Sequence, residues 1–209
     1  RVLFGTPSFI GFAMVMGLMF SGQLMFISTS SFVLIDRLGL APTVFGLCFG
    51  FMALGFMGGA TISSRLVGKV PGYRIVVGGA GLASLATGAM LLITLAGLEH
   101  PIVIVGSTFV SALGIGMSRP SAMAGALLPF SHMAGMASST LIFSQMAISS
   151  GFNVVYSTLV SPGAVALAAG MFGPITLGLL VAIFVATRVR RDEAPRAQPS
   201  TEVRAPAAS

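Results

Sequence analysis

Long runs without charge dominate the chain. No Asp, Glu, Lys or Arg occurs in five stretches, at residues 2–35, 38–64, 75–98, 101–118 and 120–187. A helix needs about 20 predominantly apolar residues to cross the hydrocarbon core of a bilayer. The first four stretches therefore supply one membrane span each, and the last must supply more than one.

Turn-forming residues divide the last stretch at Pro129-Phe130-Ser131-His132 and at Ser161-Pro162-Gly163. The period-2 alternation that membrane barrel strands need is absent. We therefore predict an all-α membrane protein with six transmembrane helices. The six spans are expected near Ser8–Leu34, Thr43–Ser64, Tyr73–Gly97, Pro101–Ala122, Ala134–Leu159 and Gly163–Thr187.

The overall composition supports a membrane protein. Hydrophobic residues make up 55% of the 209, charged residues make up 8%, and the mean hydropathy is +0.99. In soluble domains about a quarter of the residues carry charge. These values exclude an ordinary soluble domain. We expect the chain to lie in a lipid bilayer.

Basic residues near the span ends predict the orientation, because cytoplasmic loops are enriched in Lys and Arg. With a cytoplasmic N-terminus the outer side carries only Arg37. The inner side then carries Arg1, Arg65, Lys69, Arg74, Arg119, Arg188, Arg190 and Arg191. We expect both termini in the cytoplasm. The formal net charge of +6 reflects this bias and the basic C-terminal end, so no nucleic-acid partner is expected.

The composition changes at Arg188. Residues 188–209 hold half of the chain's 16 charged residues and three of its prolines. This pattern predicts a disordered cytoplasmic tail behind a transmembrane bundle that covers residues 1–187. The chain begins with Arg1 and enters a span within a few residues, so we expect the back portion of a longer protein or a truncated reading frame.

Few residues are suited to catalysis or metal binding. Cys48 is the one cysteine and lies in an apolar run. His100 and His132 fall at opposite ends of the predicted spans, so they are not expected to share a metal site. Motifs of zinc metalloproteases and phosphate-binding loops are missing. We expect neither an enzyme, nor a metal site, nor a cofactor.

Uncharged polar residues form a stripe along the fifth predicted span. Its members are spaced 3, 4 or 7 residues apart: Ser138, Gln145, Ser149, Asn153 and Tyr156. A carboxamide facing lipid would leave donors and acceptors unpaired, so the stripe should face a helix or a cavity. Two interpretations remain open, interhelical hydrogen bonding and the wall of a substrate passage.

The first two spans carry further candidate surfaces. In the first span one helical face combines apolar side chains with a polar one: Met16, Phe20, Gln23, Ile27 and Ser30. If a substrate cavity exists, its candidate residues are Phe20, Gln23, Ile27, Gln145, Ser149 and Asn153. In the second span, Gly46/Gly50 and Gly55/Gly59 make two GxxxG pairs, which allow close helix packing.

Two segments resemble a known family. "RPSAMAGALLPFSHMAGMASSTLIFSQMAISSG", residues 119–151, is similar to the connection between the tenth and eleventh spans of Bcr/CflA-type drug:proton antiporters of the major facilitator superfamily. The matching residues are Pro120, Ala122, Ala126-Leu127, Pro129-Phe130, Ala134-Gly135, Ala137-Ser138 and Gln145. "SSFVLIDRLGLAPTVFGLCFGFMALGFMGGATISSRL", residues 30–66, resembles the family's seventh and eighth helices.

The resemblance implies the C-terminal half of a twelve-helix, proton-coupled multidrug efflux transporter in a bacterial cytoplasmic (inner) membrane. It implies small amphipathic, drug-like substrates and an N-terminal transporter half as partner. No Asp or Glu lies inside a predicted span, so proton-carrying groups are expected in that other half. The alternative is a self-standing six-helix protein that acts as a dimeric pore or as a structural partner.

Five residues are candidates for topology or gating. Arg65, Lys69 and Arg74 belong to "SSRLVGKVPGYR", which resembles loosely a cytoplasmic loop of the superfamily. Arg119 is expected at the inner end of the fourth span, as a topology anchor or as a gate contact that breaks and forms during transport. Pro120 would let that end of the helix bend.

Overall fold

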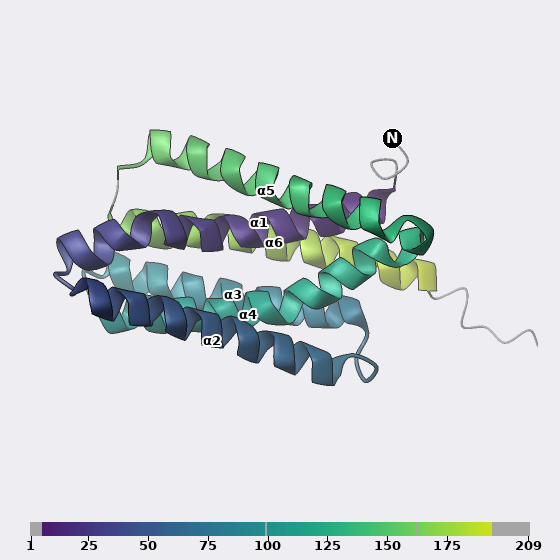
Figure 1. The fold of residues 1–209 in the computed structure, drawn as a ribbon, viewed down its shortest axis with the longest axis horizontal. Coiled ribbons are helices and arrows are strands. Elements are labelled where there is room, and N and C mark those ends of the chain that lie inside the picture. The colour runs from purple at the N-terminus through teal and green to yellow at the C-terminus, as the bar shows by residue number, and fades with distance from the viewer. Residues whose placement is uncertain (1–5, 99, 162, 194–209) are drawn as a thin grey trace, which may run out of the picture.

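The structure is a computed structural model that describes residues 6–98, 100–161 and 163–193. In this part of the chain, α-helices lie along the long axis of the molecule and alternate in direction (Figure 1). They are α1 Pro7–Ser31, α2 Pro42–Leu66, α3 Gly72–Leu95, α4 Pro101–Leu127, α5 Ala134–Leu159 and α6 Ala164–Glu193. A π-helical turn, η2 Phe32–Arg37, extends α1, and a 3₁₀ helix, η3 Leu128–Met133, joins α4 to α5.

Proline and glycine set the helix ends. Pro42 and Pro101 lie in the first turns of α2 and α4, where the missing amide hydrogen costs no helical bond. Gly68 and Gly97 follow α2 and α3 with φ of +86° and +81°, a conformation that favours glycine. The helices of the described residues begin and end within a few residues of the predicted spans, except at α4 and α6.

The number of spans differs from the six predicted. Within the described residues, five continuous apolar helical segments are long enough to cross a membrane, so a count of six is not confirmed. The fourth segment, Pro101–Leu159, contains both α4 and α5 and is 59 residues long, whereas one crossing takes about 20. Phe130 has non-helical φ and ψ of −121° and 30°, and the chain reverses direction there (Figure 1).

Helix α4 lies at the centre of one half of the bundle, packed on both α2 and α3. Glycines bring the backbones together. A Cβ atom built on Gly55 would lie 2.7 Å from the carbonyl oxygen of Phe109, and one on Gly114 would lie 2.5 Å from that of Gly79. Gly46 and Gly50 have no other atom within 4 Å of such a Cβ. Within the described residues, the second predicted GxxxG pair therefore packs against another helix and the first does not.

Helix α1 lies at the centre of the other half, packed on α5 and α6, and it also contacts α4. Large apolar side chains fill this region. Phe9 and Phe130 meet edge to face with ring centroids 5.7 Å apart, and both are buried. Helix α3 packs on α6 and so joins the two halves, with a hydrogen bond of 3.0 Å between Ser84 and Thr176.

Two predicted positions are corrected by the structure. Arg119 does not lie at the inner end of its span, because α4 continues for eight residues beyond it to Leu127 and not only to Ala122. The predicted tail begins at Arg188, but α6 extends to Glu193. The rest of the predicted tail, 194–209, and Arg1 lie outside the described residues.

Candidate functional site

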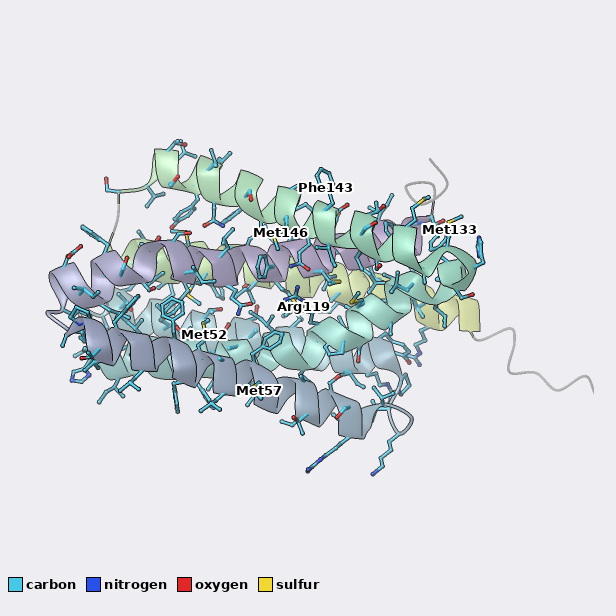
Figure 2. All side chains as sticks on the ribbon, viewed as in Figure 1. Met52, Met57, Arg119, Met133, Phe143 and Met146 are labelled. Atoms are coloured by element: carbon cyan, nitrogen blue, oxygen red, sulfur yellow. The ribbon has the colours of Figure 1, made fainter. Side chains whose placement is uncertain are left out.

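Arg119 lies deep inside the bundle. The α1 residues around it, Val15 to Phe20, are at the middle of Pro7–Ser31, and Gln145 beside it is at the middle of Ala134–Leu159. Figure 2 shows Arg119 about halfway along the bundle, between α1 and α4. The chain therefore carries a positive charge at the mid-depth of α1 and α5.

Two contacts hold the guanidinium. Its Nη2 donates to Oε1 of Gln145 at 3.4 Å, and its central carbon lies 5.4 Å from the centre of the Phe20 ring. Arg119, Phe20 and Gln145 also line one cavity, with space of about 10 Å³ for water-sized spheres, which is enough for about one. Met16, Met19 and Ser118 are part of the same lining. The site thus combines a cation, an amide and apolar walls.

Burying this charge is unfavourable. Membrane-insertion scales assign about 2.5–3.5 kcal/mol to an arginine at the centre of a spanning helix. The five acidic residues of the chain are at positions 36, 99, 192, 193 and 202, close to helix ends or beyond them. None of those that the structure describes lies at the depth of Arg119. Ionisable groups inside membranes are typically functional, so a cation at this depth marks a candidate functional site.

Gln145 is almost fully buried, with 1% of its surface exposed. Its Oε1 accepts the hydrogen bond from Arg119, but its Nε2 has no partner among the described residues. An unpaired buried amide group costs about 1–3 kcal/mol. The two Nε2 donors of this buried side chain thus have no acceptor in the described part of the chain.

The remaining stripe of α5 bonds to neighbouring helices. Ser149 Oγ donates to the carbonyl of Gly17 at 2.9 Å, and Asn153 Nδ2 donates to that of Ser21 at 3.2 Å. Tyr156 Oη donates to the carbonyl of Ala166 in α6 at 2.8 Å. These bonds favour the interpretation of interhelical bonding for this part of the stripe. Ser138 bonds only within α5.

The other predicted cavity residues are dispersed. Gln23 lines a second small cavity with Met52, Ser111 and Met171, and neither Gln23 Oε1 nor Ser111 Oγ has a partner among the described residues. Ile27 has 42% of its surface exposed and lines neither cavity. The structure therefore brings together Phe20 and Gln145 but separates them from Gln23 and Ile27.

The basic gating candidates other than Arg119 lie toward one end of the bundle. Arg65 is in the last turn of α2, and Lys69 follows in the connection to α3; both are exposed. Arg74, Tyr73 and Arg190 line an open groove of about 380 Å³ between α3 and α6. Pro120 is inside α4 and exposed. Among the described residues, no group of three His, Cys, Asp or Glu could hold a metal ion.

Comparison with known proteins gives one informative similarity. The chain is 30% identical over 129 residues to the uncharacterized MFS-type transporter YdgK of Bacillus subtilis (strain 168), where MFS denotes the major facilitator superfamily. The alignment covers 61% of this chain and 32% of that protein, so the match spans about a third of the relative's length. No protein-family model and no solved structure matches the chain. The apolar helices and this similarity together indicate a multi-pass membrane protein.

Sequence reasoning assigned Arg119 to the membrane surface and did not connect it with Gln145. One signal could have found the site. Ile115, Ser118, Arg119 and Ala122 share one helical face at spacings of 3 or 4, and the break at Pro129 leaves room for two more turns after Ala122. A span extended to that break places Arg119 well inside the helix.

Proposed function

We propose that this chain is the C-terminal six-helix bundle of a major facilitator superfamily transporter. The observation that carries the proposal is the 30% identity over 129 residues to an MFS-type transporter. The antiparallel helices of Figure 1 support it, because such transporters consist of two six-helix halves that rock around a cavity at mid-depth. In this proposal an N-terminal half completes the cavity.

Exposed apolar surface supports a partner half in the membrane. In the most apolar 18-residue stretch of α2 only 22% is buried inside the structure, against 61% in the corresponding stretch that includes α1. Leu47, Leu54 and Met57 of α2 have more than half of their surface exposed, as does Phe143 of α5. Lipid and the helices of the other half would cover these side chains. Figure 2 shows Met57 and Phe143 on opposite sides of Arg119.

The proposed topology has six spans and both termini in the cytoplasm of a bacterium, with the chain in the inner membrane. Arg65, Lys69, Arg74 and Arg190 support this orientation because they lie at or near the same end of the helices. The connection at η3 would lie at the cytoplasmic face, and the connection between α5 and α6 at the outer face.

Single cysteines test the topology. In a Cys48→Ala background, Lys69→Cys and Ser131→Cys should react with a membrane-impermeant maleimide only after the cells are opened. Ser161→Cys should react in intact cells. Equal labelling of Ser131→Cys and Ser161→Cys from outside would contradict six spans, because α5 would then not cross the membrane.

The proposed activity is proton-coupled efflux of small amphipathic compounds, as in the Bcr/CflA-type antiporters that residues 119–151 resemble. The helices of this chain carry no acidic residue at the depth of Arg119, so the proton-carrying carboxylates would belong to the N-terminal half. The chain alone would then neither couple protons nor transport.

Dye efflux tests this proposal. Energised cells would express the chain alone, or together with an N-terminal half of a similar transporter, and would be loaded with cationic ethidium or anionic carboxyfluorescein. We expect efflux only with co-expression, and its loss when an uncoupler collapses the proton gradient. Uncoupler-sensitive efflux by the chain alone would overturn the half-transporter proposal and favour a homodimer. Absence of efflux in both cases would contradict the efflux function.

A further inference from the structure

We propose that Arg119 and Gln145 bind the anionic group of a small solute, specifically a carboxylate. This inference rests on the proposed function in that it names a class of cargo for the same cavity. The binding itself needs no transport, so it can be measured separately.

Unused donors point to an acceptor ligand. The planar guanidinium of an arginine has five N–H donors, and the bond to Gln145 Oε1 at 3.4 Å uses one of them. Nε2 of Gln145 adds two donors without a partner in the described part of the chain, on a side chain that is 1% exposed. Both side chains line the same cavity. A carboxylate offers two oxygens that can accept from the guanidinium and the amide together.

The bond between the two side chains fixes their orientation. Because Gln145 Oε1 accepts from Arg119, the donating nitrogen of the amide is free for a second acceptor. In the neighbouring turns of α5, Ser149 and Asn153 already donate to α1 carbonyls at 2.9 Å and 3.2 Å. The unused donor of Gln145 therefore distinguishes it from the residues whose role is helix association.

Apolar side chains suit the remainder of an amphipathic ligand. Met16 and Met19 are buried and line the cavity beside Phe20. Unbranched methionine side chains can change rotamer at little cost, which lets a small cavity widen around different shapes. The present space of about 10 Å³ must grow in this way before an aromatic acid can enter.

Charge favours an anion over a neutral or cationic group. The five acidic residues of the chain lie at positions 36, 99, 192, 193 and 202, so the helices supply no carboxylate beside Arg119. An anionic solute would neutralise the half-buried cation and accept its hydrogen bonds. A cationic solute would be repelled by the same charge.

Binding of a matched pair of probes tests the proposal. The full chain in phosphatidylcholine nanodiscs would be titrated with 4-fluorobenzoate and with 4-fluorobenzamide, which has nearly the same shape but no charge. Fluorine NMR would report binding above that of empty nanodiscs. We expect a Kd at least about tenfold lower for the acid, the effect of a charge-assisted hydrogen bond. Equal affinities would overturn the proposal.

Variants assign the binding to the two residues. Arg119→Gln and Gln145→Leu should each weaken 4-fluorobenzoate binding, about tenfold for the first, and weaken 4-fluorobenzamide binding less, because the amide carries no charge. Gln145→Glu should abolish binding of the acid while raising the melting temperature, because it supplies an internal carboxylate to the guanidinium. Cys48 is buried and is the one cysteine, so a thiol-reactive dye reports unfolding and shows that each variant is folded.

Arg74→Gln is the matched control, because it removes the same charge from the groove at the end of the bundle. It should change the Kd of 4-fluorobenzoate less than twofold. An equal loss in Arg74→Gln and Arg119→Gln would assign the effect to net charge and overturn the site. Measurement on the chain co-purified with an N-terminal half provides the last comparison. Loss of binding in that complex would mean that a carboxylate of the N-terminal half pairs with the Arg119 guanidinium. That result would overturn the solute proposal.

Discussion

Helix α4 contacts its neighbours in two different ways. Toward α2 and α3, glycines let the backbones meet, as at Gly55 and Gly79. Hydroxyl groups bond across these contacts, with Ser118 Oγ donating to the Val76 carbonyl at 3.0 Å. Toward α1 and α5, the contact consists of long side chains, among them Arg119 and Gln145, around a small cavity.

The difference shows how one helix can have both a structural and a functional face. Small residues let two helices approach closely, so their backbones make van der Waals contact without a gap. Long, flexible side chains leave space and can rearrange around a ligand. A substitution on the first face should therefore change stability, while one on the second should change binding.

The largest stability loss is expected for Gly59→Ala. A Cβ atom at this position would collide with the backbone carbonyl of Leu113 and lie 2.8 Å from the amide nitrogen of Met117. Separating α2 from α4 should cost about 1–3 kcal/mol of unfolding free energy. Thermal unfolding of the purified chain, followed through the reaction of Cys48, measures the loss.

Gly50→Ala is the control for this prediction, since no other atom lies within 4 Å of its Cβ position. Replacing a glycine inside a helix by alanine there should stabilise the chain by about 0.5–1 kcal/mol. If the two variants unfold at the same temperature, close packing of α2 on α4 is refuted.

Arg119→Met should have the opposite effect on stability. The substitution removes the half-buried charge and keeps a long apolar side chain, but it loses the contacts with Phe20 and Gln145. Because desolvation of an unneutralised charge outweighs such contacts, we expect a gain of about 1 kcal/mol and a higher melting temperature. Arg119→Lys keeps the charge and should show no gain. A lower melting temperature in Arg119→Met would mean that the cation holds α4 and α1 together.

The smallest effect is expected for Asn153→Leu. The variant loses the bond from Nδ2 to the Ser21 carbonyl at 3.2 Å, and interhelical hydrogen bonds in membranes contribute about 0.6 kcal/mol on average. The same unfolding assay measures the change. Ser157→Ala is the control, since its hydroxyl is exposed and bonds only to Val154 of its own helix. A loss above about 2 kcal/mol would show that α5 depends on this one bond.

Much of the secondary structure could be predicted from the sequence, because charge is excluded from membrane spans and proline and glycine mark their ends. The breaks at Pro129-Phe130 and at Ser161 coincide with η3 and with the end of α5. The end of α4 could not be predicted in this way. Arg119 suggested a span end, since long basic side chains commonly reach the membrane surface from there.

The candidate site was predictable only in part. Phe20 and Gln145 were recognised as cavity candidates from helical spacing, and the structure brings them together around Arg119. Gln23 and Ile27 share the same spacing on α1 but lie elsewhere, because Gln23 meets α4 at Ser111, about two turns from Arg119, and Ile27 is 42% exposed. The spacing of residues identifies which side chains share one face of a helix. It does not identify where along that helix a neighbouring helix packs.

By itself, the sequence determined that this protein is helical and apolar, and where most of its helices begin and end. These properties depend on local composition and on turn chemistry. The tertiary structure decided which glycine pair packs, that Arg119 lies inside the bundle, and that it meets Gln145 across 26 positions of sequence. Those outcomes depend on how each helix is rotated and tilted against the others, and this is set by the fit of side chains from several helices at once.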